Sequence, residues 1–217
     1  MFVQCEDIDF YDPAAAYHLQ RYYQWAWQVV KRYGGHNSRV NRVLTGDKGN
    51  QLHILFGAPI APDAPDQALR CALALQQHRP TFITCQRIGL TVGRVFAGAV
   101  GSLNRREYTV VGRMVNLSAR LTQICPPDGI LVDEATAVRV QSQIVAQPLP
   151  PVSLKGHAEP VAVFQVIAER TAVTQAQARF RQWQQPPAGR EEELGQLCQQ
   201  MTAALAGSGG LVAIHGS

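Results

Sequence analysis

The feature that most constrains the fold of this 217-residue chain is the alternation of short apolar segments with longer amphipathic ones. The run Gln86 to Val100 is rich in β-branched and small residues and predicts two strands broken at Gly93-Arg94. Pro65 to Gln77 and Met114 to Ile124 carry apolar residues at helical spacing instead, and Pro126-Pro127-Asp128-Gly129 marks a stop after the second. The pattern predicts a single twisted sheet with helices packed on it.

The first third of the chain predicts a short strand, a helix and a hairpin. The strand lies within Met1 to Phe10, and the helix begins after Asp12-Pro13 and ends at Gly34-Gly35. Apolar segments on either side of GDKGN, Arg39 to Thr45 and Gln51 to Phe56, predict the two strands of a hairpin with a glycine-bearing loop.

Composition narrows the class of protein. With 46% hydrophobic and 17% charged residues the chain can bury a full core, and its net charge of +4 is scattered, which argues against nucleic acid as a partner. Five cysteines without CxxC spacing suit reduced thiols in a cytoplasmic protein, where they act as small apolar fillers. The acidic start of the chain and the lack of a long apolar window predict neither an export signal nor a membrane span.

One polar pair stands out in the third predicted helix. Asn116 and Arg120 are four residues apart, so they lie on the same face of a helix about one turn apart and can reach one ligand. An amide and a guanidinium donate hydrogen bonds without transferring protons, which suits a developing phosphate charge. Taken without context, the same pair is also what a solvated polar helix face contains.

The surrounding sequence supplies that context. The stretch YTVVGRMVNLSARL, Tyr108 to Leu121, closely resembles the signature of class III adenylyl and guanylyl cyclases. Further blocks of that family appear in the family's order: HILFGAP, DQALRCALAL, IGLTVGRVFAGAVG, PPDGILVDEA and LKGHAEPVAVFQV. The resemblance extends from Met1 to about Ala168, and within the family it is strongest to the second cyclase homology domain of soluble adenylyl cyclases and bacterial cyclase-ATPase proteins, which share the DKG turn.

The resemblance implies a fold and a reaction. The fold is the α+β, ferredoxin-like class III nucleotidyl cyclase fold, with a mostly antiparallel sheet and packed helices. The reaction is the conversion of ATP to cyclic AMP, in which the residue matching Asn116 orients the ribose. The residue matching Arg120 stabilises the pentacovalent phosphorus as the 3′-hydroxyl attacks the α-phosphate.

Three further residues take their expected roles from the same resemblance. Thr109 matches the position that helps recognise the purine, where a threonine is similar to adenine-selective members; a strand threonine without a ligand is the alternative. Arg42 matches the base-contacting lysine position, and this departure from the family leaves the role of Arg42 in base recognition open because Arg and Lys differ in size and hydrogen-bond geometry. GTP stays an alternative to ATP as the substrate. Lys155 is either a triphosphate contact or a solvated turn lysine.

The metal site is where the match to the family fails. Family members hold two Mg²⁺ ions on paired carboxylates, because hard cations require oxygen ligands. Alignment of the first strand places Gln4 at the first Asp position, and counting back from Phe56-Gly57 places Asn50 at the second. Both amides can form hydrogen bonds but lack the negative charge.

We therefore expect this chain alone to bind no metal, and Mg²⁺ or Mn²⁺ to be supplied through a partner domain. Asp7, Asp9 and Asp47 are alternative carboxylates if the alignment shifts by a few residues. An acid on an exposed loop is, however, usually only solvated.

The domain organisation follows from a change of composition. We expect residues 1–168 to form the cyclase homology domain and 169–188, rich in Gln, Arg and Ala, to form a linker or bridging helix. Residues 189–217 resemble the start of a P-loop ATPase domain, with a GREEEL box, a helix, a strand at Leu211 to Ile214, and Gly216 as the first glycine of the phosphate loop. We therefore expect this chain to be a fragment of a larger cyclase-ATPase protein.

Two functions are consistent with these features. In the first, the chain pairs with a metal-bearing cyclase domain, expected upstream in the same polypeptide, and forms cyclic AMP from ATP in intracellular signal transduction. In the second, the lost carboxylates make it an inactive regulatory or nucleotide-sensing module that controls a downstream ATPase domain. Asn116, Arg120 and Thr109 together favour the first.

Overall fold

The computed structural model describes residues 1–6, 8–9, 11–34, 39–44, 50–58, 62–102, 106–154, 159–170, 191–205 and 207. The chain divides into two compact units, Met1–Ala172 and Val173–Ser217. The first unit contains all the strands described below, and the second contains helix α6, Glu191–Leu205.

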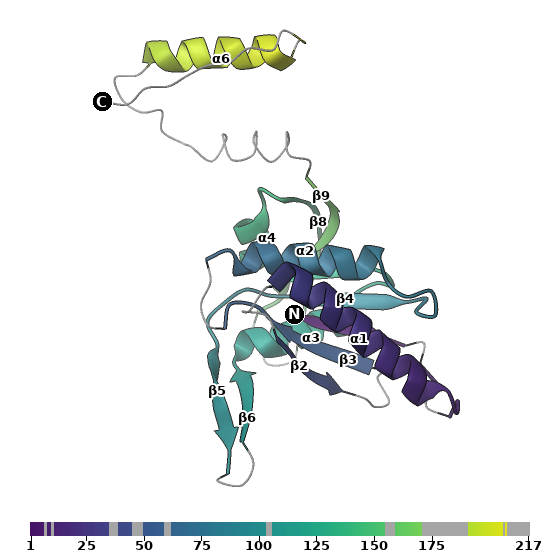
Figure 1. Ribbon diagram of the computed structural model, residues 1–217. Coiled ribbons are helices and arrows are strands. Elements are labelled where there is room, and N and C mark those ends of the chain that lie inside the picture. Colours follow the sequence, from purple (N-terminus) through teal and green to yellow (C-terminus); the bar gives the residue numbers. More distant parts are fainter. Residues whose placement is uncertain are drawn as a thin grey trace. The chain divides into compact units, whose positions relative to one another are not determined.

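Strands and helices alternate through the first unit, as the sequence predicts (Figure 1). The strands are β1 (Phe2–Cys5), β2 (Arg39–Leu44), β3 (Asn50–Leu55), β4 (Gln86–Leu90), β5 (Phe96–Gly101), β6 (Arg106–Val111), β7 (Ile130–Asp133), β8 (Ile144–Val152) and β9 (Val161–Glu169). The helices are α1 (Ala15–Gly34), α2 (Ala64–Gln77), α3 (Arg113–Ile124) and α4 (Glu134–Val140).

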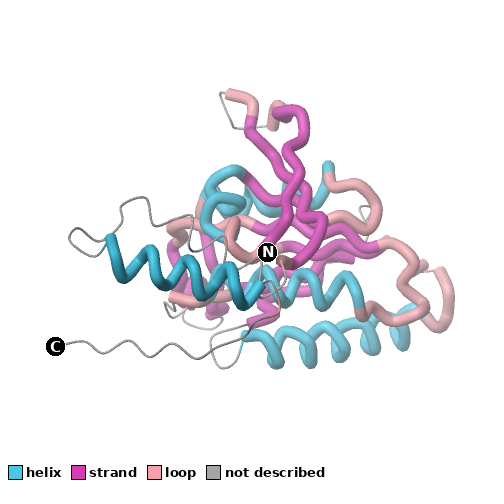
Figure 2. Tube along the Cα trace, turned by 90° about the horizontal axis from the view of Figure 1, so that it is seen from above, coloured by secondary structure: helices cyan, strands magenta, loops and turns pink. Residues whose placement is uncertain are grey.

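The described strands form two sheets, so the prediction of a single sheet is wrong. Seven strands pair in the order β2-β3-β1-β4-β7-β9-β8, and every neighbouring pair is antiparallel except β4 with β7. Among the described strands, β5 and β6 pair only with each other, and they extend away from the large sheet (Figure 1). The view from above shows the strands of the large sheet with helices packed along them (Figure 2). Residue patterns predict strands but carry little information on which strands pair.

The seven-stranded sheet is covered on both faces. On one face, Val3, Ile54 and Ile88 are buried in a core with residues of α1, α2 and α4. On the other face α3 packs directly on β4, where an added Cβ on Gly89 would lie 2.2 Å from the carbonyl oxygen of Ser118. Only glycine allows the helix to approach the strand so closely.

Buried polar groups between the sheet and α1 are hydrogen-bonded to one another. The Tyr22 hydroxyl donates to Gln86 Oε1 at 2.7 Å, and Gln86 Nε2 donates to the carbonyl oxygen of Leu75 at 3.0 Å. These bonds offset the cost of burying a phenol and an amide in an apolar core. They fix α1 and α2 on the sheet.

Two sequence predictions on the cysteines and the tail have different outcomes. Cys5, Cys71 and Cys125 are buried, as expected of apolar fillers, whereas Cys198 on α6 is exposed. The predicted linker, 169–188, begins inside strand β9, which ends at Glu169, and its residues 171–188 lie outside the described residues. The strand predicted at Leu211 to Ile214 and the predicted phosphate-loop glycine, Gly216, also lie outside them. Among the helices that the structure describes, none combines the length and apolar character needed to cross a membrane.

Candidate functional site

Helix α3 presents two predicted site residues away from the sheet. Its buried face consists of Leu117, Ser118, Leu121 and Thr122, which pack toward β4 and β7. Asn116 is exposed and Arg120 is half-buried. Because four residues make about one helical turn, the two side chains project from neighbouring positions on one side of the helix. Within the described part of the chain, neither side chain forms a hydrogen bond or ion pair, so both are available to a ligand.

The base of α3 is held rigidly. The Ser118 hydroxyl donates to the carbonyl oxygen of Gly89 at 2.7 Å, and the Thr122 hydroxyl donates back to the carbonyl oxygen of Ser118 at 2.9 Å. Leu117 and Leu121 are buried in a second apolar core with Leu131. These contacts fix the helix backbone from which Asn116 and Arg120 project.

Thr109 lies on the β5–β6 hairpin, directly before α3. It is half-buried and pairs with Gly98 across the hairpin. Paired residues of antiparallel strands share a face, so Thr109 lies on the face that also carries Phe96 and Val111, which are 60% and 59% exposed. The opposite face carries Val110, which is buried. An exposed apolar strip therefore lies on the same face as the predicted base-recognition residue.

Gln4 and Asn50, which match the positions of the family's metal carboxylates, lie on opposite faces of the sheet. Gln4 pairs with Gln51, whose Nε2 donates to Gln4 Oε1 at 3.3 Å, and Gln4 Nε2 donates to Glu6 Oε1 at 3.4 Å. Asn50 pairs with Cys5, one residue further along β1, and so projects from the other face. Asn50 is 0% exposed, and its side-chain nitrogen and oxygen find no hydrogen-bond partner among the described residues.

This arrangement does not fit a two-metal site. Two neutral amides on opposite faces of one sheet offer neither the charge nor the convergence that Mg²⁺ needs. Among the described residues, no group of three or more His, Cys, Asp or Glu side chains could hold a metal ion.

The alternative carboxylates and the remaining site residues are only partly described. Asp9 is exposed, and its Oδ1 accepts a hydrogen bond from the backbone N–H of Tyr11 at 2.9 Å, which is a turn contact. Asp7, Asp47 and Lys155 lie outside the described residues, and Arg42 lies on β2 with its side chain outside them.

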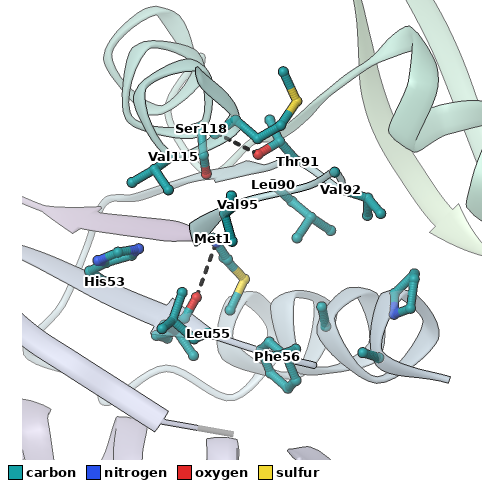
Figure 3. Close-up of a pocket in the computed structure, with 16 residues that line it drawn as sticks. Met1, His53, Leu55, Phe56, Leu90, Thr91, Val92, Val95, Val115 and Ser118 are labelled. Carbon is teal, nitrogen blue, oxygen red and sulfur yellow. Dashed lines mark hydrogen bonds between the residues drawn. The ribbon is translucent and has the colours of Figure 1, made fainter. Parts of the chain in front are cut away.

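A cavity of about 120 Å³ lies beside α3 (Figure 3). Val115 and Ser118 line it from the helix, and Leu55, Phe56 and Leu90 line it from the opposite side. Asn116 and Arg120 are not among its lining residues. The cavity is therefore separate from the polar pair, which projects from a different part of the helix.

Two carboxylates outside α3 have displaced pKa values. Burial raises the pKa of Asp133, and the hydrogen bond that it accepts from the Thr136 hydroxyl acts in the opposite direction. The hydrogen bond from Arg79 lowers the pKa of Asp128, which also accepts from the backbone N–H of Gln86. Both carboxylates hold local structure around β4 and β7.

Sequence reasoning missed two features near the site. One is the exposed apolar strip. Phe96 and Val100 are four residues apart on β5 and so lie on one face, but their exposure becomes clear only because β5 pairs with β6 and not with the large sheet. The other is Thr136, a fully buried hydroxyl whose partners include a residue far away in sequence. A threonine in a short helix gives no signal of its own.

Comparison with solved structures defines the class of fold. The chain is similar to the guanylate cyclase domain of RhGC from Catenaria anguillulae, with a TM-score of 0.65 and 23% identity over 78% of this chain and 94% of that one. It is also similar to the adenylyl cyclase CyaB from P. aeruginosa, with a TM-score of 0.67 and 20% identity over 78% of this chain and 92% of that one. The fold is that of the class III cyclase domains, as predicted.

Sequence comparison then gives the family. Residues 37–168 match the model of the adenylate and guanylate cyclase catalytic domain, and the chain belongs to that family. It is 34% identical over 149 residues to adenylate cyclase type 10 of Rattus norvegicus, covering 64% of this chain and 9% of the relative. It is 28% identical over 179 residues to adenylate cyclase 1 of Rhizobium meliloti, covering 74% of this chain and 25% of the relative. The chain thus spans a quarter or less of the length of these relatives.

Proposed function

We propose that this chain is the half of a cyclase pair that holds the nucleotide and stabilises the transition state, converting ATP to cyclic AMP with a partner domain that carries the metal ions. The observation that carries the proposal is the contrast on the structure: Asn116 and Arg120 project from a rigid helix, while Gln4 and Asn50 cannot form a carboxylate pair. A domain of this kind needs a second domain to complete its site.

The exposed strip on the hairpin supports the need for a partner. Phe96, Val100 and Val111 share one face of β5–β6 with Thr109, and each is exposed. Apolar side chains gathered on one face beside a polar residue are typical of an interaction surface. A partner covering this strip would enclose Thr109 and exclude water from a base bound there.

The chemistry that this chain supplies is charge stabilisation. As the ribose 3′-hydroxyl attacks the α-phosphate, negative charge grows on the phosphate oxygens and on the leaving pyrophosphate. The Arg120 guanidinium donates hydrogen bonds to those oxygens, and the Asn116 amide holds the ribose in line. Metal ions held by the partner would neutralise the phosphates. We propose ATP rather than GTP as the substrate because the chain is similar to adenylate cyclases.

The test is reconstitution with a cyclase domain that carries both aspartates. Cyclic AMP formation should require both chains, and Arg120→Ala should lower kcat by about 10²–10³ with a smaller effect on the KM for ATP, because the lost donor acts mainly in the transition state. Arg113→Ala, which removes an exposed arginine from the first turn of the same helix, is the matched control and should change kcat little. A pair that tolerates Arg120→Ala within a few-fold would overturn the assignment.

A second candidate function is favoured by the buried state of Asn50. A buried amide at the position that matches a metal-binding carboxylate is what we expect of a regulatory module, one that senses a nucleotide or transmits dimer geometry to an attached ATPase domain. Titration of the reconstituted pair with ATP separates the two. Binding without cyclic AMP formation at any metal concentration favours the regulatory module.

A further inference from the structure

A short loop connects β4 to the projecting hairpin, and its backbone is tied to α4. The backbone N–H of Val92 donates to the Thr136 hydroxyl oxygen at 2.8 Å. The same hydroxyl donates a hydrogen bond to Asp133 Oδ1. Thr136 is 0% exposed and Asp133 is also buried, so no water competes for these bonds. The hydroxyl thus both donates and accepts, and Val92 is fixed to the first turn of α4.

The other side of this loop presses against the start of α3. The Thr91 hydroxyl donates to the carbonyl oxygen of Met114 at 2.8 Å. An added Cβ on Gly93 would lie 2.5 Å from Met114 Cγ, and one on Gly112 would lie 3.1 Å from Val95 Cγ1. The close-up shows Thr91, Val92 and Val95 beside the helix that carries Val115 and Ser118 (Figure 3). Loop residues 91–95 therefore fill the space between α4 and the first turn of α3.

We propose that Thr136 is a positioning residue for the catalytic helix, acting through Val92 to fix loop 91–95 and hence the first turn of α3. Asn116 follows Met114 by two residues, so a displacement of the loop moves the ribose-orienting amide directly. Loop 91–95 also leads into β5, so the same displacement tilts the hairpin that bears Thr109. The inference rests on the proposed function, since it assigns Thr136 to that same site.

A purely local role for Thr136 makes a different prediction. Asp133 is the N-cap residue of α4, and a hydrogen bond between these two side chains also stabilises the first turn of that helix. If this were all, replacing Thr136 would lower stability and leave catalysis intact. A positioning role requires a change in kcat that a comparable loss of stability elsewhere in α4 does not cause.

The experiment uses the full 217-residue chain with its metal-bearing partner and three variants. Thr136→Val keeps the shape and removes both hydrogen bonds, Thr136→Ser restores them, and Ala137→Gly weakens the same helix without touching Val92. Thr136→Val should lower kcat about 10-fold, because small misplacements of reacting groups are costly. Its KM for ATP should change less, and Thr136→Ser should stay within a few-fold of the parent chain.

Amide hydrogen exchange supplies a readout that does not depend on activity. The Val92 N–H should exchange faster in Thr136→Val than in Thr136→Ser or Ala137→Gly, and the NMR signals of the Asn116 side-chain amide should shift with it. If Thr136→Val matches Ala137→Gly in kcat and in Val92 exchange, the inference is overturned. If the parent pair makes no cyclic AMP, the proposed function fails, and unchanged Asn116 signals in Thr136→Val would then overturn the positioning role as well.

Discussion

Polar side chains have opposite surroundings on helix α3 and on the paired strands β1 and β3. On α3, two polar residues project outward from a helix whose opposite face carries buried leucines and hydrogen-bonded hydroxyls. On the β1–β3 pair, Gln4 contacts Gln51 and Glu6, while Asn50 is buried without a hydrogen-bond partner among the described residues. The polar groups on α3 can therefore form hydrogen bonds with a ligand. Those of Gln4 are used within the fold, and those of Asn50 are buried.

The difference indicates which half of a two-part site this domain can supply. Transition-state donors need a fixed support, and the buried face of α3 provides one. Metal ligands must converge with negative charge, and the side chains of Gln4 and Asn50 do not. The predictions below test each side of this contrast.

The largest expected effect is the absence of activity from the chain alone. A homodimer would bring Gln4 and Asn50 to both of its sites, so we expect little or no cyclic AMP with Mg²⁺ or Mn²⁺. The measurement is product formation by the purified chain, with and without its partner. Robust activity of the chain alone, abolished by Asp47→Ala, would contradict the prediction that this chain lacks a metal site and would identify Asp47 as a metal ligand.

Restoring a carboxylate at the buried position should cost stability rather than create a site. Asn50→Asp places a charge where the residue is 0% exposed, and we expect a loss of about 3 kcal/mol at neutral pH. Burial raises the pKa of such an acid, so the loss should shrink as the pH falls through that raised pKa. Gln51→Glu, one residue away on the opposite and more exposed face, is the matched control.

Denaturant unfolding of the two variants at neutral and acidic pH makes this comparison. Equal stability of Asn50→Asp and Gln51→Glu at neutral pH would show that position 50 is solvated. The β1–β3 pair would then be open to a metal ion.

Sequence patterns predict the elements better than their arrangement. The helices around Tyr22, Leu69 and Leu117 follow from apolar spacing, and glycine and proline stops locate their ends to within a few residues. The separation of β5–β6 from the main sheet is not predictable in this way, because it depends on pairing between distant strands. Family resemblance supplies what periodicity cannot, namely the class III fold.

The site shows the same limit. The i, i+4 spacing of Asn116 and Arg120 is enough to place them on one side of a helix. The opposite orientation of Gln4 and Asn50 requires the register of β1 with β3, and the role of Thr136 requires its contact with Val92. The contact between Val92 and Thr136 joins residues that are 44 positions apart, and no local pattern records it.

Truncation should show that both regions depend on the first unit alone. We propose that the chain ending at Ala172 keeps nearly the full thermal stability of the 217-residue chain, since the compact unit ends there. Ending at Ala168 should cost about 2 kcal/mol. It removes Arg170, whose backbone N–H donates to the carbonyl oxygen of Gln143 and whose Nε donates to that of Ile144, both at 2.6 Å.

Thermal melts and limited proteolysis of the three chains provide the comparison. Unfolding of the chain ending at Ala172 would mean that the segment after it packs on the cyclase domain. The surroundings of α3 and of strands β1 and β3 would then include that segment.

The smallest expected effect concerns the far end of α3, where Asp128 holds the turn that leads into β7. Arg79 donates to both carboxylate oxygens of Asp128, and the backbone N–H of Gln86 donates to one of them at 3.1 Å. Because these bonds lower the pKa of Asp128, the ionised form stabilises the fold above the ordinary pKa of an aspartate, and this contribution is lost as the pH falls through the lowered value. Asp128→Asn should cost only about 0.5–1 kcal/mol at neutral pH, since the pair is partly exposed and therefore screened by solvent. The difference from the parent chain should vanish at low pH, while Asp133, whose pKa is raised, titrates in both proteins and cancels. Thermal melts at neutral and acidic pH measure this difference. A difference that persists in acid would mean that Asp128 acts through hydrogen bonds that an amide cannot replace, rather than through its charge.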